Sequence, residues 1–237
     1  MGSEMCIRDR ATDSFNTCCA NSQVIRYADD ITIVHFLRRE AEDNLQLEWR
    51  NLVHWSNAHC LPLNINKCAV MDIVTKKNMC LPSVVTETGI SLPSCSSLPL
   101  LGVVFSNDLR WNDHVHSIVK KASRRIFLIR NLKRAGCSAS VMFSAYVAFI
   151  RSVLLYCFPV FCNVSSSLFN SIKRVERRVF RLIGKEAHDF LTIDVAAENV
   201  CKRLFNHVSQ DVQHPLRLVH EPDKLSVPPR VNKPKSF

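Results

Sequence analysis

The pattern of apolar and polar positions changes character halfway along the chain. In the first half, β-branched residues flank a short acidic turn, which predicts a β-hairpin over residues 23–36. Residues 39–59 carry apolar side chains at spacings of three and four, which predicts a helix that ends before Pro62. Residues 67–74 and 100–105 have the pattern of short strands, the second with Gly102 inside it.

From residue 115 onward, the apolar positions follow the period of a helix. The first apolar stripe runs to Ile129, and Gly136 is expected to end its helix. A second, apolar helix is predicted from residue 140, and a third from about residue 167 to Gly184. A weaker helical stretch covers residues 189–208, and a Pro- and Lys-rich tail follows from residue 222. The fold class expected is α+β, with a strand-rich first half and a helical second half.

Residues 141–161 are apolar enough to raise the question of a membrane span. Arg151 lies near the middle of this stretch and Pro159 near its end. A spanning helix needs about 20 predominantly apolar residues, and a central charge is costly there. The stretch is therefore interpreted as a buried core helix, and no membrane partner is expected.

The charge of the chain is positive. Lysine and arginine outnumber aspartate and glutamate by 31 to 21 among 237 residues, which gives a formal net charge of +10. A positive excess favours polyanionic partners through counterion release. It identifies no partner by itself, because many basic proteins only carry a solvated basic face.

The 11 cysteines follow no regular framework. No CxxC pair is present, and the adjacent Cys18 and Cys19 lack the spacing of a zinc knuckle. Reduced thiols in an intracellular protein are the simplest interpretation, with the compartment left open between nucleus and cytoplasm. Cys201 and the histidines after it are too loosely spaced to predict a metal site.

The first residues of the chain require a separate interpretation. Residues 5–10 resemble the translation of an adapter used in sequencing libraries. We therefore expect residues 1–22 to be an artefactual or disordered start and the natural protein to extend further upstream.

The four residues Tyr27, Ala28, Asp29 and Asp30 form the sharpest chemical signal in the chain. Two adjacent carboxylates at a tight turn offer oxygen ligands to a hard cation such as Mg²⁺, and nucleotidyl transfer uses two such ions. Taken alone, the four residues fit an ordinary acidic turn better, because aspartate is common in turns. The segments that follow decide between the two interpretations.

The Tyr-Ala-Asp-Asp sequence resembles the catalytic motif of reverse transcriptases, and later segments resemble those of non-LTR retroelements in the same order. These segments are LNINK at 63–67, LLGV at 100–103, LRWNDHV at 109–115, IRSVLLY at 150–156, VERRVFR at 175–181 and HPL at 214–216. The resemblance covers about residues 23–216. Two positions depart from the family, with Ser152 where proline is usual and Leu155 where glutamate is common.

The resemblance implies a role for each matching position. Asp29 would bind Mg²⁺ with Asp30 as its supporting neighbour, and Tyr27 would lie near the incoming nucleotide or the primer end. Lys67 would protonate the pyrophosphate leaving group, with an ordinary surface lysine as the alternative. The remaining positions would contact the template–primer duplex: Leu101, Gly102 and Val103 beneath the primer strand, and Lys120, Arg124, Arg177, Arg178 and Arg181 at its phosphates. A solvated helix face is the alternative for these basic residues.

The family's other metal-binding aspartate is expected upstream of Tyr27, on a palm strand that this sequence lacks. The fingers and an endonuclease-like constellation are missing too. Residues 23–110 are therefore interpreted as the end of a polymerase palm, residues 111–185 as a helical thumb and residues 186–237 as a C-terminal extension. We expect a fragment of an RNA-directed DNA polymerase that is inactive alone, its partners being an RNA template and a DNA primer. A non-catalytic nucleic-acid-binding module and a non-functional remnant are the alternatives.

Overall fold

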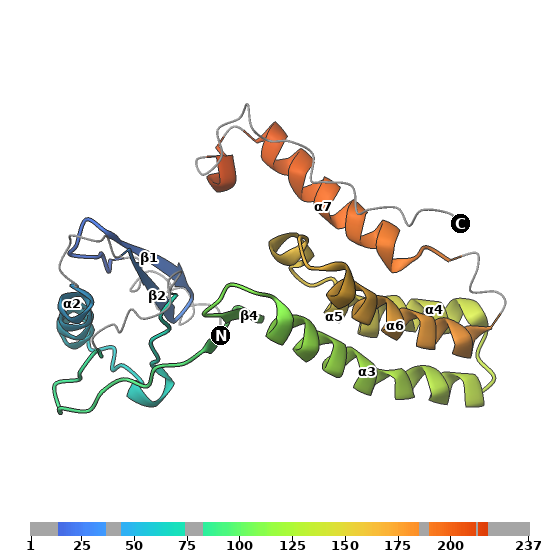
Figure 1. The fold of residues 1–237 in the computed structure, drawn as a ribbon, viewed down its shortest axis with the longest axis horizontal. Helices are drawn as coiled ribbons and strands as arrows, with labels where there is room; N and C mark the ends of the chain where they lie inside the picture. Colours follow the sequence, from blue (N-terminus) through green and yellow to red (C-terminus); the bar gives the residue numbers. More distant parts are fainter. Residues whose placement is uncertain (1–13, 37–43, 74–82, 185–189, 212, 218–237) are drawn as a thin grey trace. The chain divides into compact units, whose positions relative to one another are not determined.

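The computed structural model describes residues 14–36, 44–73, 83–184, 190–211 and 213–217. The chain divides into two compact units. Unit 1 comprises residues 1–98 and 106–109, and unit 2 comprises residues 99–105 and 110–237. Both helices and strands are present (Figure 1), so the mixed α and β class expected from the sequence is confirmed. The division differs from the expected boundaries at residues 110 and 185, because residues 99–105 and the last long helix both group with the helical bundle.

Unit 1 is built from one hairpin, one helix and loops. Strands β1 (Ser22–Tyr27) and β2 (Asp30–His35) pair antiparallel, which confirms the predicted hairpin. Helix α2 (Leu45–Ala58) follows, then the short 3₁₀ helix η1 (Ile65–Lys67). Buried side chains of α2 form a small core with residues from the loops, joined by half-buried residues of the hairpin. The buried members are Phe15, Trp49, Leu52, Trp55, Val84 and Leu92.

The packed part of unit 1 begins earlier in the chain than expected. The sequence assigns residues 14–22 to an artefactual or disordered start, yet Phe15 is 1% exposed and packs edge-on against Trp55 at 5.5 Å. Trp55 also donates its indole N–H to the Ser14 hydroxyl at 3.0 Å. Since α2 holds this segment at several points, the boundary at residue 22 falls inside a folded region.

Two strand predictions in this half were wrong. Of the strand expected over residues 67–74, residue 74 lies outside the described residues. Residues 67–73 contain the end of η1 and one isolated bridge, between Val70 and Ser94. The stretch 100–105 is not one strand but a hairpin turn, between β3 (Ser97–Leu100) and β4 (Val103–Ser106). Leu101 and Gly102 have φ values of 48° and 82°, and such left-handed residues reverse the chain.

Unit 2 is a helical bundle around one continuous core. Helix α3 (Asn112–Arg134) lies alongside α6 (Ser166–Ile183), as Figure 1 shows. Along the sequence, four shorter elements connect α3 to α6: α4 (Ala139–Tyr146), the π-helical turn η2 (Val147–Arg151), α5 (Ser152–Leu154) and η3 (Phe158–Phe161). Helix α7 (Ile193–Gln210) packs against η3 and α6, and the turn η5 (Pro215–Arg217) follows it.

The apolar stripes predicted for α3 and α6 face this core. Val115, Ile118, Ala122, Ile126 and Ile129 are buried on α3, and Val119 is half-buried. On α6 the buried residues include Ile172, Val175, Val179 and Ile183, with Leu182 half-buried. The apolar stretch from residue 141 is interrupted, because the chain leaves the helix after Leu154 and Cys157 takes a φ of 52°. No helix in the described part of the chain has the length and apolar character needed to cross a membrane.

Candidate nucleic-acid interface

The acidic motif lies at the tip of the β1–β2 hairpin in unit 1. Tyr27 pairs with Asp30 at the end of the ladder, so Ala28 and Asp29 form a two-residue turn. Ala28 has a φ of 53°, a left-handed conformation that tightens the turn. Tyr27, Asp29 and Asp30 are all exposed, and Lys67, at the end of η1, is exposed as well.

The described residues do not complete a magnesium site around this turn. Among them, no third histidine, cysteine or carboxylate lies with Asp29 and Asp30 at metal-ligand distances. No ion pair within the described ranges includes either aspartate. Mg²⁺ needs near-octahedral oxygen coordination, so two carboxylates at a hairpin tip offer only part of a site.

The predicted primer contacts lie on the turn between β3 and β4, in unit 2. The Tyr156 hydroxyl donates to the Leu101 carbonyl oxygen at 2.9 Å. A Cβ added at Gly102 would lie 3.1 Å from the Tyr156 ring, so the ring lies close against the backbone of the turn. Leu101 and Gly102 are exposed and Val103 is buried. The turn is therefore exposed at Leu101 and Gly102, and Tyr156 supports its backbone from within unit 2.

His114 supports the next strand of the same hairpin. Its Nδ1 accepts the backbone N–H of Val104 at 3.2 Å, so the proton of the neutral ring is on Nε2. The ring packs edge-on against Phe161 at 4.6 Å and is 1% exposed. Burial, and then the positive charge of Lys121, lower the pKa of His114, which therefore favours the neutral form.

A buried ion pair fixes α6 in the bundle, and the sequence interpretation missed it. Arg151 and Glu176 lie 3.2 Å apart with their side chains 8% and 7% exposed. The Tyr146 hydroxyl donates to the same Glu176 oxygen at 2.9 Å, and Arg151 also donates to the Leu191 carbonyl. The Arg151 guanidinium lies 4.8 Å from the centre of the Tyr146 ring. These contacts set the rotation of α6 about its axis.

With Glu176 turned inward, the outer face of α6 is strongly basic. Arg177, Arg178 and Arg181 are exposed, as predicted, and Arg174 joins them at the spacing of one helix face. These four residues, called the arginine face below, line a hollow of about 400 Å³. Within the described residues none of the four forms an ion pair, whereas the neighbouring Lys173 pairs with Asp194.

The other two predicted phosphate contacts lie on a different helix. Lys120 and Arg124 are exposed on α3, one turn apart. They do not line the hollow of the arginine face. The structure thus divides the predicted contacts between two helices of unit 2.

Comparisons with protein-family models, curated proteins and solved structures found no match.

Proposed function

We propose that the chain is the C-terminal palm and thumb part of an RNA-directed DNA polymerase of the non-LTR retroelement type. In the intact enzyme it would serve template-directed nucleotidyl transfer with Mg²⁺. The part present here binds the template–primer duplex through unit 2 and does not catalyse extension alone. Such an activity fits an intracellular protein with reduced thiols.

The observation that carries the proposal is that motif segments far apart in sequence touch one another in unit 2. Segment 150–156 supplies Arg151, which pairs with Glu176 of segment 175–181, and Tyr156, which supports the turn of segment 100–103. Segment 109–115 supplies His114, which accepts from the backbone N–H of Val104, the residue directly after segment 100–103. Each of these segments resembles a family segment in sequence, and the segments follow the family's order along the chain. Their mutual contacts support the interpretation that they belong to one functional unit.

The arginine face supports duplex binding in particular. Four guanidinium groups lie within about 10 Å along α6, given a rise of 1.5 Å per residue. A duplex carries roughly one negative charge per 1.7 Å of its axis, so the two charge densities are comparable. Because Glu176 is engaged inside the bundle, it does not neutralise this face.

Binding is tested with a primed RNA–DNA duplex and a matched pair of variants. Replacing Arg177, Arg178 and Arg181 by glutamine should weaken binding severely, because three phosphate contacts are lost. Replacing Arg130, Arg134 and Arg203 by glutamine makes the same change in net charge at exposed positions of unit 2. Equal loss in both triple variants would contradict a defined interface and leave only general charge attraction.

Catalysis is tested by primer extension on an RNA template with deoxynucleotides and Mg²⁺. The purified chain should incorporate nothing, since Asp29 and Asp30 have no third ligand among the described residues. Incorporation that is abolished by Asp29→Ala would overturn the claim that this part is inactive alone.

A non-catalytic binding module is the second candidate. The incomplete carboxylate site at Asp29 and Asp30 favours a binding module over an enzyme. Duplex binding by the arginine face would involve residues of α6 and not the carboxylates of unit 1. The two candidates differ when the missing upstream part of a palm is supplied in trans. Extension restored by that part supports the polymerase, and unchanged binding without extension supports the module.

A further inference from the structure

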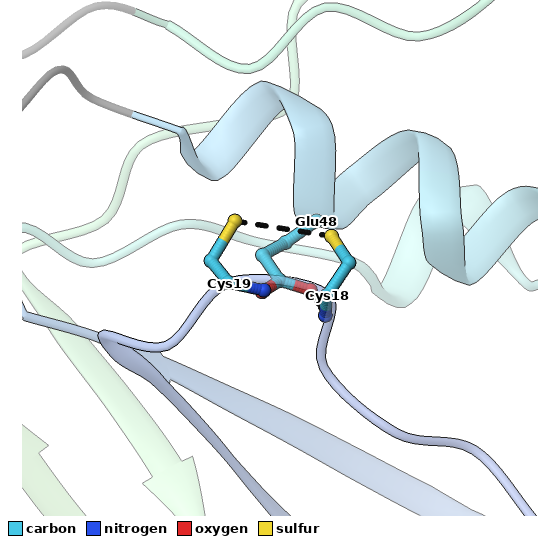
Figure 2. Close-up of side chains that lie close together, drawn as sticks. All are labelled: Cys18, Cys19 and Glu48. Atoms are coloured by element: carbon cyan, nitrogen blue, oxygen red, sulfur yellow. Dashed lines mark hydrogen bonds between the residues drawn. The ribbon is translucent and has the colours of Figure 1, made fainter.

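A second cluster of metal-ligating groups lies in unit 1, away from the acidic turn. Figure 2 shows Cys18 and Cys19 side by side against Glu48 of α2. The two Sγ atoms are 3.8 Å apart. The two sulfurs and a carboxylate oxygen all lie within 4.8 Å of one another.

The backbone explains how two adjacent thiols reach the same side. In an extended strand, neighbouring side chains point to opposite faces. Here the chain bends before β1, and Glu48 accepts the backbone N–H groups of Cys18 at 3.1 Å and Cys19 at 2.8 Å. Glu48 is 0% exposed, and its hydrogen bonds to the two backbone N–H groups hold the bend against α2. The Ser22 side chain is a third hydrogen-bond partner of Glu48. A carboxylate has about four lone-pair positions, so these three partners leave one position for a cation.

The separation of the two sulfurs matches a tetrahedral thiolate site, and the carboxylate oxygen lies within 4.8 Å of them. Zinc binds sulfur at about 2.3 Å and carboxylate oxygen at about 2.0–2.2 Å, and two tetrahedral sulfurs at that distance are about 3.8 Å apart. We propose that Cys18, Cys19 and Glu48 form a three-ligand site for one thiophilic divalent cation such as Zn²⁺. Each thiol releases its proton to solvent on binding. Because Cys18 is exposed, the fourth position is open to water.

This site differs in chemistry from the magnesium site expected at Asp29 and Asp30. Thiolates select soft and borderline cations, whereas Mg²⁺ prefers oxygen ligands. A bound cation would join the segment before β1 to α2. Small cores commonly need such a metal staple, and the core of unit 1 is small.

Residue-resolved alkylation of the whole chain tests the site with Zn²⁺ as the probe. Trypsin releases Cys18 and Cys19 together in peptide 11–26, which contains no other cysteine, and Cys60 alone in peptide 51–67. Cys60 is an exposed thiol of the same unit and serves as the matched control. Zn²⁺ should slow iodoacetamide labelling of peptide 11–26 by about tenfold or more and leave peptide 51–67 unchanged, while Mg²⁺ should protect neither.

Two variants separate the ligands. Cys18→Ser retains the backbone N–H to Glu48, so the bend should persist while Cys19 loses its protection. Glu48→Gln retains the side-chain size and should raise the Zn²⁺ concentration for half-protection by about tenfold. Circular dichroism checks that each variant is folded. Equal protection of both peptides, no protection of either, or an unchanged midpoint in a folded Glu48→Gln protein would overturn the three-ligand site.

Discussion

Unit 1 and unit 2 hold their motif residues in different ways. In unit 2, Tyr156 and Arg151 each contact a second motif segment, and His114 contacts the residue directly after one. Arg151 and His114 are buried. In unit 1, Asp29 and Asp30 are exposed at the tip of a hairpin, and neither forms an ion pair among the described residues. Unit 2 therefore orders its motif residues through its own contacts, whereas under the proposed function the acidic turn needs further structure to become a catalytic site.

The hydrophobic core of unit 2 is also larger than that of unit 1. One cluster in unit 2 joins residues of α3, α4, α6 and α7 with those of η2 and η3. The core of unit 1 rests on one face of α2 and on loop residues, and β1 and β2 form a two-stranded sheet. Ile25 and Phe36 are about half exposed on or beside that sheet. We therefore expect unit 1 to unfold first, since exposed apolar edges contribute little stability.

The largest effect should come from breaking the buried ion pair of unit 2. Arg151→Ala leaves the Glu176 charge buried without its partner, which should cost about 3–5 kcal/mol of unfolding free energy. Lys173→Ala, which breaks the partly exposed pair with Asp194, should cost less than about 1 kcal/mol. Urea unfolding followed by circular dichroism measures both. Equal costs would show that the buried pair does not organise the bundle.

A smaller effect is expected at the turn that Tyr156 supports. Gly102→Ala places a Cβ at a φ of +82° and 3.1 Å from the Tyr156 ring. The left-handed backbone alone should cost about 1–2 kcal/mol. Gly136→Ala is the control, because its φ is +74° and no atom lies within 4 Å of the added Cβ. Gly102→Ala should lower the unfolding free energy more than Gly136→Ala does. An equal or larger loss for Gly136→Ala would argue against close packing of Tyr156 on the turn.

The pH dependence of stability sharpens the same contrast. Burial keeps the pKa of His114 below its ordinary value of 6.5, so the unfolded chain binds the proton more readily. His114 should therefore contribute stability above pH 6.5 that is lost as the pH falls toward the lower folded pKa. His114→Asn keeps an acceptor for the Val104 N–H but cannot titrate. Urea unfolding between pH 7 and pH 5 should show that the unfolding free energy of this variant changes less with pH than that of the original chain. Identical pH dependence in both proteins would show that His114 does not contribute to it.

The smallest effect is expected at the acidic turn itself. Asp29→Asn and Asp30→Asn change exposed side chains that form no ion pair among the described residues. Each should shift the unfolding free energy by no more than about 0.5 kcal/mol. A larger loss would mean that the turn is held by contacts as strongly as the motif residues of unit 2.

Helical periodicity was the more reliable signal in this sequence. It predicted α3 and α6 nearly to their ends, because burial against a neighbouring helix repeats at the helical period. The β1–β2 hairpin was also predicted correctly. Short apolar runs were less informative, since Val103 and its neighbours fit a strand equally well with or without a turn at Gly102.

The structural roles of two glutamates, Glu176 and Glu48, were not predicted, because their partners are distant in the sequence. Glu176 is four residues after Ile172 and three before Val179. Glu48 is three residues after Leu45 and four before Leu52. Each therefore lies within a buried stripe, which is a signal that an acidic side chain has an internal partner. The partners themselves are 25 and about 30 residues away, so local pattern does not identify them.

The salt dependence of duplex binding tests the central claim most directly. Log affinity should fall linearly with log salt, and each phosphate contact contributes about 0.9 to the slope. The triple variant Arg177→Gln, Arg178→Gln and Arg181→Gln should reduce the magnitude of the slope by about three units without changing sequence preference. The control variant at Arg130, Arg134 and Arg203 should keep the original slope. If the first triple variant leaves both affinity and slope unchanged, the arginine face is only a solvated helix surface and the duplex-binding account fails.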